Sequence, residues 1–268
     1  MVRLLHAART DVGMIRSGNE DNFSVKAPQG ASRGLFIVAD GMGGHAAGEV
    51  ASEMAVQTIE RELEALKDLD ETRGAERIAD ALRKANRTIH DRTIAEVDKQ
   101  GMGTTASVLL IWDSHYLIGQ VGDSRVYLLR DGALSQLTKD HSYVQEQVDA
   151  GFLTPEQARY HPYSNVITRC VGASPDVEPD IYRGEVKVGD LFLVASDGLT
   201  GMVDDRRLQI LLMSRAEPER KVHALISEAN GRGGLDNITA IVVQVAPEED
   251  GATANNQTTP SVTPSARQ

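Results

Sequence analysis

The sequence has little of what defines several protein classes. Its one cysteine, Cys170, excludes a disulfide framework within the chain and a zinc or iron–sulfur site built on several cysteines. Its 28 lysines and arginines are outnumbered by 39 aspartates and glutamates. A protein that binds duplex nucleic acid through many phosphates needs the opposite balance, so we expect no nucleic acid partner.

Long apolar runs are also absent. The longest ones, such as Leu35 to Ala39, have the length of a strand, far below the ~20 residues of a membrane-spanning helix. The first residues, Met-Val-Arg-Leu-Leu-His, lack the apolar segment of a signal peptide. We therefore expect no membrane segment and a soluble, cytoplasmic protein in a reducing compartment.

The first half of the chain combines strand and helix patterns. Short apolar stretches at Val25 and at Leu35 to Ala39 are bounded by Gly, Pro and Asn and predict strands. Apolar residues then recur at helical spacing from Val50 to Leu66 and from Ile78 to Val97. Each segment carries one apolar stripe, so the sequence predicts two long helices that lie on a sheet.

The pattern changes after Thr104. Three short apolar runs, Ala106–Trp112, Tyr116–Val121 and Val126–Leu129, are bounded by turn residues and predict an antiparallel meander. Two short helices are expected at Ser142 to Ala150 and Pro155 to Tyr160, because Thr154 and Gln157 have the spacing of a capping box and Pro155 fits the first helical position.

Strands return at Asp190–Ala195 and Ile238–Val245, with a helix around Val222–Ala229 between them. This succession predicts an α+β domain with two sheets, to which we assign residues 1–246. Residues 247–268 are almost devoid of apolar side chains. Such a segment cannot offset the entropy lost on ordering, so we expect a disordered tail.

Four aspartates stand beside the predicted strand ends: Asp40, Asp123, Asp197 and Asp236. Any one of them alone is better explained as a turn residue. Several carboxylates that point into one cleft repel one another unless a cation lies between them, and oxygen ligands favour Mg²⁺ or Mn²⁺ over zinc. Together the four predict a site for divalent cations.

Arg16 precedes Glu20 and Asp21 in a stretch of turn-forming residues. Its planar guanidinium can bind a phosphate through two hydrogen bonds while the carboxylates hold water on a metal ion. A surface ion pair, which contributes little to stability, explains these residues equally well when they are taken alone.

These segments, in this order, resemble the metal-dependent protein phosphatase family (PPM, type 2C). Arg16 to Asp21 resembles the phosphate-binding motif that opens the family's pattern, and Val38 to His45 resembles its metal-bridging motif, in the glycine-rich form of bacterial members. The later motifs follow in the expected order: Gly103-Thr104-Thr105, Gly122 to Arg125, Ala195 to Leu199, and Asp236-Asn237. The resemblance spans residues 16 to 245.

The resemblance implies a four-layer α-β-β-α sandwich with two central antiparallel sheets flanked by helices. It also implies two core metal ions, Mn²⁺ or Mg²⁺. Asp40 would bridge both ions, the Gly41 carbonyl would bind one of them, and Asp197 and Asp236 would bind the other.

The remaining site residues also take their roles from the resemblance. Arg16 would bind the phosphate, Glu20 and Asp21 would act through water, and Asp123 would hold a third, weaker ion. Residues 141 to about 175 would form the variable flap beside the active site.

One position departs from the family. Many eukaryotic members have a histidine directly after the Asp-Gly pair, proposed as the acid that protonates the leaving group. Met42 occupies that place here, and His45 comes three residues too late to inherit the role by alignment. The general acid is therefore left unassigned.

The implied reaction is hydrolysis of phosphoserine and phosphothreonine by water activated between two ions, with no phosphoenzyme. Two alternatives stay open: a catalytically silent phosphoprotein-binding module of the same fold, and a metal-dependent hydrolase of small phosphorylated molecules. The expected partners are phosphorylated proteins and an opposing serine/threonine protein kinase.

Overall fold

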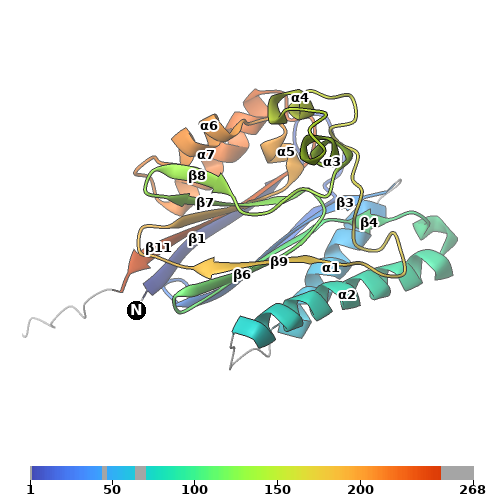
Figure 1. Cartoon of the computed structure of the whole chain (residues 1–268), viewed down its shortest axis with the longest axis horizontal. Helices are drawn as coiled ribbons and strands as arrows, with labels where there is room; N and C mark the ends of the chain where they lie inside the picture. Colours follow the sequence, from blue (N-terminus) through green and yellow to red (C-terminus); the bar gives the residue numbers. More distant parts are fainter. Residues whose placement is uncertain (1, 44–46, 64–70, 249–268) are drawn as a thin grey trace, which may run out of the picture.

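Two antiparallel sheets lie face to face in this computed structural model, which describes residues 2–43, 47–63 and 71–248, and helices cover their outer faces (Figure 1). The β1 sheet contains, in spatial order, β1 (Val2–Asp11), β11 (Ile238–Pro247), β10 (Leu191–Ala195), β7 (Arg125–Arg130) and β8 (Ala133–Gln136). The β2 sheet contains β2 (Asp21–Lys26), β3 (Arg33–Met42), β5 (Ala106–Trp112), β6 (His115–Val121) and β9 (Asp180–Glu185), with β4 (Gly103–Thr104) paired to β3.

Helices form the two outer layers. Those on the β2 sheet are α1 (Ala47–Leu63) and α2 (Glu71–Ala95), followed by the short η1 (Val97–Lys99). Those on the β1 sheet are α5 (Asp197–Thr200), α6 (Asp205–Leu212) and α7 (Pro218–Gly231). Helices α3 (Tyr143–Asp149) and α4 (Pro155–Arg159) lie within residues 141–175, the segment expected to form the flap and called the flap below. The expected α+β fold, with four layers in the order α-β-β-α, is confirmed. None of the helices in the described ranges combines the length and apolar composition that a membrane crossing requires.

The long apolar runs are explained by burial on both faces of each sheet. Leu35, Ile37 and Ala39 of β3 pack with the helices of the α1 and α2 layer, whereas Phe36 and Val38 pack against the other sheet. Because successive side chains in a strand point to opposite faces, a strand that is buried on both faces reads as a continuous apolar run. Strand β10 divides its side chains in the same way.

The predicted meander is wrong at its third strand. Strands β5 and β6 pair as expected, but β7 pairs with β10 and β8 in the other sheet. The chain crosses between the sheets at Gly122, whose φ is 101°, a conformation that favours glycine. The buried Gln120 amide donates to the carbonyl oxygens of Gly122 (3.0 Å) and Ser124 (2.7 Å), so these groups stay paired where the strand ladder ends. Asp123 lies in this crossing.

Two element boundaries differ from the prediction. Strand β3 continues to Met42, so Asp40 lies within a strand and not at its end. Helix α2 stops at Ala95, and Val97, which the helical spacing placed on the apolar stripe, is 80% exposed in η1. Strand β11 extends to Pro247, one residue past the assigned domain boundary.

The two short helices of the flap are confirmed. Ser142 caps α3, and Thr154 and Gln157 form the expected capping box at α4. Leu66, His45 and residues 249–268 of the expected tail lie outside the described residues.

Candidate metal centre

The predicted aspartates come from both sheets and meet at one end of the sandwich. Asp21 begins β2 and lies opposite Asp40 of β3 in the strand register. Asp197 begins α5 directly after β10, and Asp236 precedes β11. Asp40 interacts electrostatically with Asp21, Asp197 and Asp123, and Asp197 does so with Asp236. The fold therefore brings all five carboxylates into one cluster.

The carboxyl groups of Asp40 and Asp197 lie close enough for each to shift the pKa of the other. Burial and then the charges of Asp21, Asp197 and Asp123 raise the pKa of Asp40 well above its ordinary value. Burial also raises the pKa of Asp197, and the interaction with the Asp40 carboxyl partly offsets this rise. Without a cation, this cluster favours bound protons.

Asp123 and Asp21 are 6% and 7% exposed. Burial raises the pKa of Asp21 to about 7, although two hydroxyl donors oppose the shift. Burial, together with the charges of Asp197 and Asp140, raises the pKa of Asp123 well above its ordinary value. The protein partners of these carboxyls thus do not fully compensate for the desolvation of the ionised form.

Three buried carboxylate oxygens of the cluster lack a hydrogen-bond partner. They are Oδ1 of Asp21, Asp123 and Asp197, and the described residues contain one other such side-chain atom, on Asn230. A buried oxygen without a partner is costly, and a divalent cation is the partner that a carboxylate cluster fits. The donors present therefore fit Mg²⁺ or Mn²⁺.

Water or backbone oxygens would complete the coordination. No three acidic, histidine or cysteine side chains of the described ranges are gathered closely enough to hold one ion by themselves.

A chain of hydroxyl groups, missed in the sequence, positions Asp21. Thr239 Oγ1 donates to Asp21 Oδ2 over 2.6 Å, and Ser196 Oγ donates to the same oxygen over 2.8 Å. Thr239 is bonded in turn to Thr10 (2.8 Å), which accepts from the Asn19 amide (2.8 Å). With Oδ2 held by two donors, Oδ1 is the oxygen left free. The only sequence signal was that Ser196 and Thr239 lie in or beside motif segments.

Arg16 reaches the cluster through Asp236. Its Nη2 donates to Asp236 Oδ2 over 2.7 Å, and the arginine side chain is 51% exposed. This hydrogen bond and the charge of Asp236 raise the pKa of Arg16. The guanidinium is thus placed at the rim of the cluster with half of its surface open to solvent.

Glu20, Gly41 and the start of α1 are packed in direct contact. The Gly41 N–H donates to the Glu20 carbonyl oxygen over 3.1 Å, and a Cβ on Gly41 would lie 2.1 Å from the Gly48 carbonyl oxygen. Burial raises the pKa of Glu20, which the charge of Arg16 partly offsets. The Asn237 amide, also missed as a functional residue, accepts from the Glu20 N–H over 2.8 Å.

A partly buried arginine compensates part of the negative charge. The single Nε–H of Arg125 is shared between the two carboxylate oxygens of Asp140, each at 3.0 Å, and Nη2 donates to Asp140 Oδ2 over 2.7 Å. Its charge lowers the pKa of Asp123 and of Asp197. Arg125 belongs to a motif segment, but its spacing gave no indication that Asp140 is its partner.

The flap is attached at both ends to segments next to site residues. His141 N–H donates to the Gly122 carbonyl oxygen over 2.9 Å, and Gly122 N–H donates to His141 Nδ1 over 3.1 Å, directly before Asp123. At the other end, Thr104 and Val171 exchange two backbone hydrogen bonds of 3.0 and 2.8 Å.

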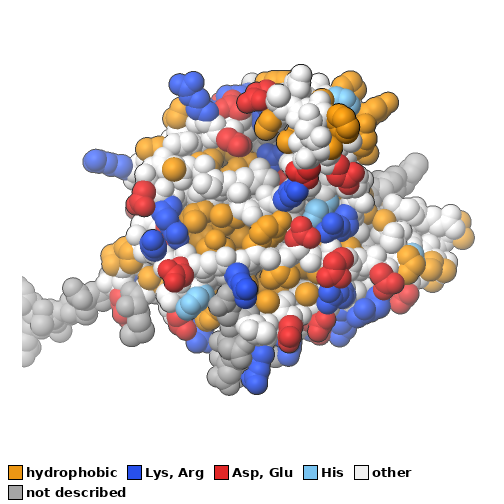
Figure 2. Space-filling model, viewed as in Figure 1, with side chains coloured by type: hydrophobic (Ala, Val, Ile, Leu, Met, Phe, Trp, Pro, Cys, Tyr) orange, Lys and Arg blue, Asp and Glu red, His pale blue; other side chains and the backbone are white. Residues whose placement is uncertain are grey.

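The outer surface of the flap exposes several aromatic side chains among polar ones. Figure 2 shows hydrophobic side chains near α3 and α4, mixed with polar and charged ones. The exposed aromatic residues there are Tyr143, Phe152, Tyr160 and Tyr163.

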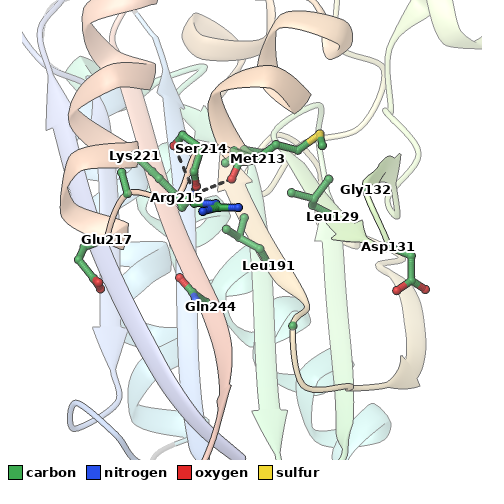
Figure 3. Close-up of a pocket in the computed structure, with 13 residues that line it drawn as sticks. Leu129, Asp131, Gly132, Leu191, Met213, Ser214, Arg215, Glu217, Lys221 and Gln244 are labelled. Atoms are coloured by element: carbon green, nitrogen blue, oxygen red, sulfur yellow. Dashed lines mark hydrogen bonds between the residues drawn. The ribbon is translucent and has the colours of Figure 1, made fainter.

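A pocket of about 320 Å³ lies at the opposite end of the β1 sheet (Figure 3). Leu129, Leu191 and Gln244 line it, at strand ends away from the aspartates. Lys221 also lines it, but its ammonium donates to the carbonyl oxygens of Leu212 (2.5 Å) and Ser214. This buried lysine therefore holds the end of α6, and the pocket is separate from the candidate metal centre.

Comparison with known proteins agrees with this site. Residues 16–229 match the family model described as Protein phosphatase 2C. The serine/threonine phosphatase stp of Listeria welshimeri is 40% identical over 245 residues, which cover 90% of this chain and 96% of that protein. The solved structure of the S. agalactiae serine/threonine phosphatase has a TM-score of 0.84 and 37% identity, and covers 90% of this chain and 99% of its own.

A second solved structure is the catalytic domain of the serine/threonine protein phosphatase PstP in complex with two manganese ions. It has a TM-score of 0.81 and 38% identity, and the match covers 92% of this chain and 100% of that chain. The fold, the order of the motifs and the sequence identity to known phosphatases over nearly the whole chain all agree. This chain is therefore a phosphatase that belongs to the protein phosphatase 2C family.

Proposed function

We propose that this chain hydrolyses phosphoserine and phosphothreonine in proteins with the help of two divalent ions, Mn²⁺ or Mg²⁺, and without a phosphoenzyme. The observation that carries the proposal is the set of buried, unpartnered carboxylate oxygens on Asp21, Asp123 and Asp197. When bound, such ions lower the pKa of a shared water and stabilise the charge of the phosphoryl group.

The donors of the core site are divided between the two sheets. Asp40, whose carboxyl interacts electrostatically with those of Asp21, Asp197 and Asp123, is the proposed bridge between the two ions. Asp197 and Asp236 are the proposed ligands of one ion, and the Gly41 carbonyl is a proposed ligand of the other.

The outer residues have separate proposed tasks. Arg16 binds the phosphoryl oxygens and stabilises their charge in the transition state, which its half-exposed place beside Asp236 supports. Glu20 and Asp21 hold water, and Asp123 binds a third, weaker ion. The general acid stays unassigned.

The alternative is a phosphoprotein-binding module that does not hydrolyse its ligand. Every aspartate of the proposed ligand set is present in this chain, and the clustered carboxyls favour cation binding, so hydrolysis is the better-supported function. A hydrolase of small phosphorylated molecules is the other alternative, and a comparison of phosphopeptide with nucleotide turnover separates it.

Since the proposed reaction consumes phosphoproteins, a protein serine/threonine kinase has to supply them. We propose such a kinase as the functional counterpart. The cytoplasmic location expected from the sequence stays a prediction.

The test is Asp197→Ala, with phosphate release from a phosphothreonine peptide measured in the presence of Mn²⁺. We expect turnover to be abolished while thermal unfolding still shows a folded protein, because the substitution removes a buried carboxyl from a cluster of like charge. Asp80→Ala, at an exposed carboxylate of α2, is the control that keeps full activity. Metal-dependent turnover by Asp197→Ala would contradict the ligand assignment.

A further inference from the structure

Three large apolar side chains stand exposed beside Arg16. Met14 is 65% exposed, Ile15 67% and Leu235 56%. Single exposed apolar residues are common on proteins, but these three lie within two residues of Arg16 or Asp236, which are themselves joined over 2.7 Å. We call Met14, Ile15 and Leu235 the apolar rim.

Hydrogen bonds fix the two loops that carry the rim. Met14 N–H donates to the Gly234 carbonyl oxygen over 2.8 Å. The buried Asn237 amide donates to the carbonyl oxygens of Val12 and Gly18, both over 2.9 Å. The loop before Arg16 is thus tied to the loop before β11 at several points.

Two glycines permit this close approach. Gly13 has a φ of 82°, and a Cβ there would lie 2.2 Å from the Asp236 carbonyl oxygen. Gly234 has a φ of 49°, and a Cβ there would lie 2.8 Å from Met14 Cγ. The fold therefore holds the rim in place. Its apolar side chains face solvent, because no partner in the described residues covers them.

We propose that the apolar rim is a subsite that selects phosphoproteins with a large apolar side chain beside the phosphorylated serine or threonine. The inference rests on the proposed function, in which Arg16 binds the phosphoryl group. Successive residues of an extended peptide are about 3.3 Å apart, so the neighbours of a phosphoresidue held at Arg16 reach the surface next to it. Ile15 adjoins Arg16 in the chain, and Leu235 adjoins Asp236.

The positive charge of Arg16 beside the apolar rim fits a phosphorylated residue with an apolar neighbour. A phosphorylated residue supplies the anion for the Arg16 guanidinium, and an apolar neighbour covers surface that is otherwise left in water.

The experiment compares two phosphothreonine peptides that differ only in the flanking residues, leucine in one and serine in the other. The measured quantity is the ratio of their kcat/KM values with saturating Mn²⁺, in which a general loss of activity cancels. For the unaltered protein we expect a ratio of about tenfold or more in favour of leucine, the range of discrimination typical of apolar contacts, expressed mainly in KM.

The variant Met14→Ser with Ile15→Ser should bring this ratio to within about twofold of unity. Ile210→Ser is the matched control, because Ile210 is 53% exposed on α6 in the outer helical layer, and it should keep the full ratio. Thermal unfolding shows that each variant is folded. A Leu235→Ser variant tests the second loop independently.

Three results would overturn the subsite. One is a ratio near unity for the unaltered protein, while a small aryl phosphate is still hydrolysed. Another is an unchanged ratio in the rim variants. The third is a dimer in sedimentation that the rim substitutions dissociate, which would identify a second copy of the chain as the occupant. If the unaltered protein hydrolyses neither peptide nor aryl phosphate, the proposed function itself fails, and the subsite with it.

Discussion

Thr239→Val removes one of the two hydroxyl donors to Asp21 and keeps the size and branching of the side chain. Thr239 Oγ1 donates to Asp21 Oδ2 over 2.6 Å in a buried setting. A hydrogen bond to a charged group contributes about 1.5–3 kcal/mol, and mutation of the hydrogen-bonding groups around a metal site typically costs about 10- to 100-fold in metal affinity.

The direction of the effect follows from the Asp21 carboxyl. Burial raises its pKa to about 7, and the Thr239 hydroxyl opposes that shift. Without this donor the pKa rises further, so a proton competes more strongly with the cation at pH 7. We expect Mn²⁺ affinity to fall by about 10- to 100-fold at pH 7, and by less at pH 8.5.

Calorimetric titration of Mn²⁺ into the metal-free protein at both pH values measures this change. Thr58→Val makes the same substitution at a buried position of α1 and should leave the affinity unaltered. Equal Mn²⁺ affinities for Thr239→Val and the unaltered protein, both folded, would refute the role given to the hydroxyl chain.

Three further outcomes are expected. The folded-state pKa of Asp21 is raised to about 7, and that of Asp40 is also raised. The folded metal-free protein therefore binds more protons than the unfolded chain, and its stability falls as pH rises from about 4 through 7. Added Mn²⁺ should therefore raise the Tm more at pH 8 than at pH 5, and an equal gain at both would contradict this. Gly41→Ala should unfold the protein or displace α1, because its Cβ would lie 2.1 Å from the Gly48 carbonyl oxygen; a native Tm and native Mn²⁺ affinity would speak against that packing. Phe192→Ala, in the core between the sheets, should lower the free energy of unfolding by about 3–5 kcal/mol in denaturant titration, and a loss below about 1 kcal/mol would mean that the core is less tightly packed than described.

The elements that the sequence predicted are those with a local signal. Thr154 and Gln157 lie three residues apart and form their capping box within one turn of α4. The run from Leu35 to Ala39 is apolar throughout, and β3 is indeed buried on both faces. Strand β9, Asp180–Glu185, was missed because it is a polar edge strand with no fully buried residue.

The sheet that each strand joins is not a local property. Nothing in the run from Val126 to Leu129 distinguishes pairing with β6 from pairing with β10, and the crossing depends on how Gln120 satisfies the carbonyl groups of the connection. Tertiary pairing therefore overrode the simple expectation that successive strands are neighbours.

The candidate site divides in the same way. The aspartates were found from the sequence because each stands beside a predicted strand and because the motifs occur in order. The ion pair of Arg16 with Asp236 joins residues 220 positions apart, and the bond of Thr239 to Asp21 joins residues 218 apart. Such contacts are created by the closure of β1, β2 and β11 around one end of the sandwich, and no spacing in the sequence encodes them.

The most direct test of a metal-dependent phosphatase is phosphate release from a phosphothreonine peptide by the purified protein, first with Mn²⁺ and then with excess chelator. The proposed function predicts release that appears with Mn²⁺, stops with chelator and returns when Mn²⁺ is restored. A folded protein that binds Mn²⁺ in calorimetry yet releases no phosphate, or one whose release persists in chelator, would contradict it.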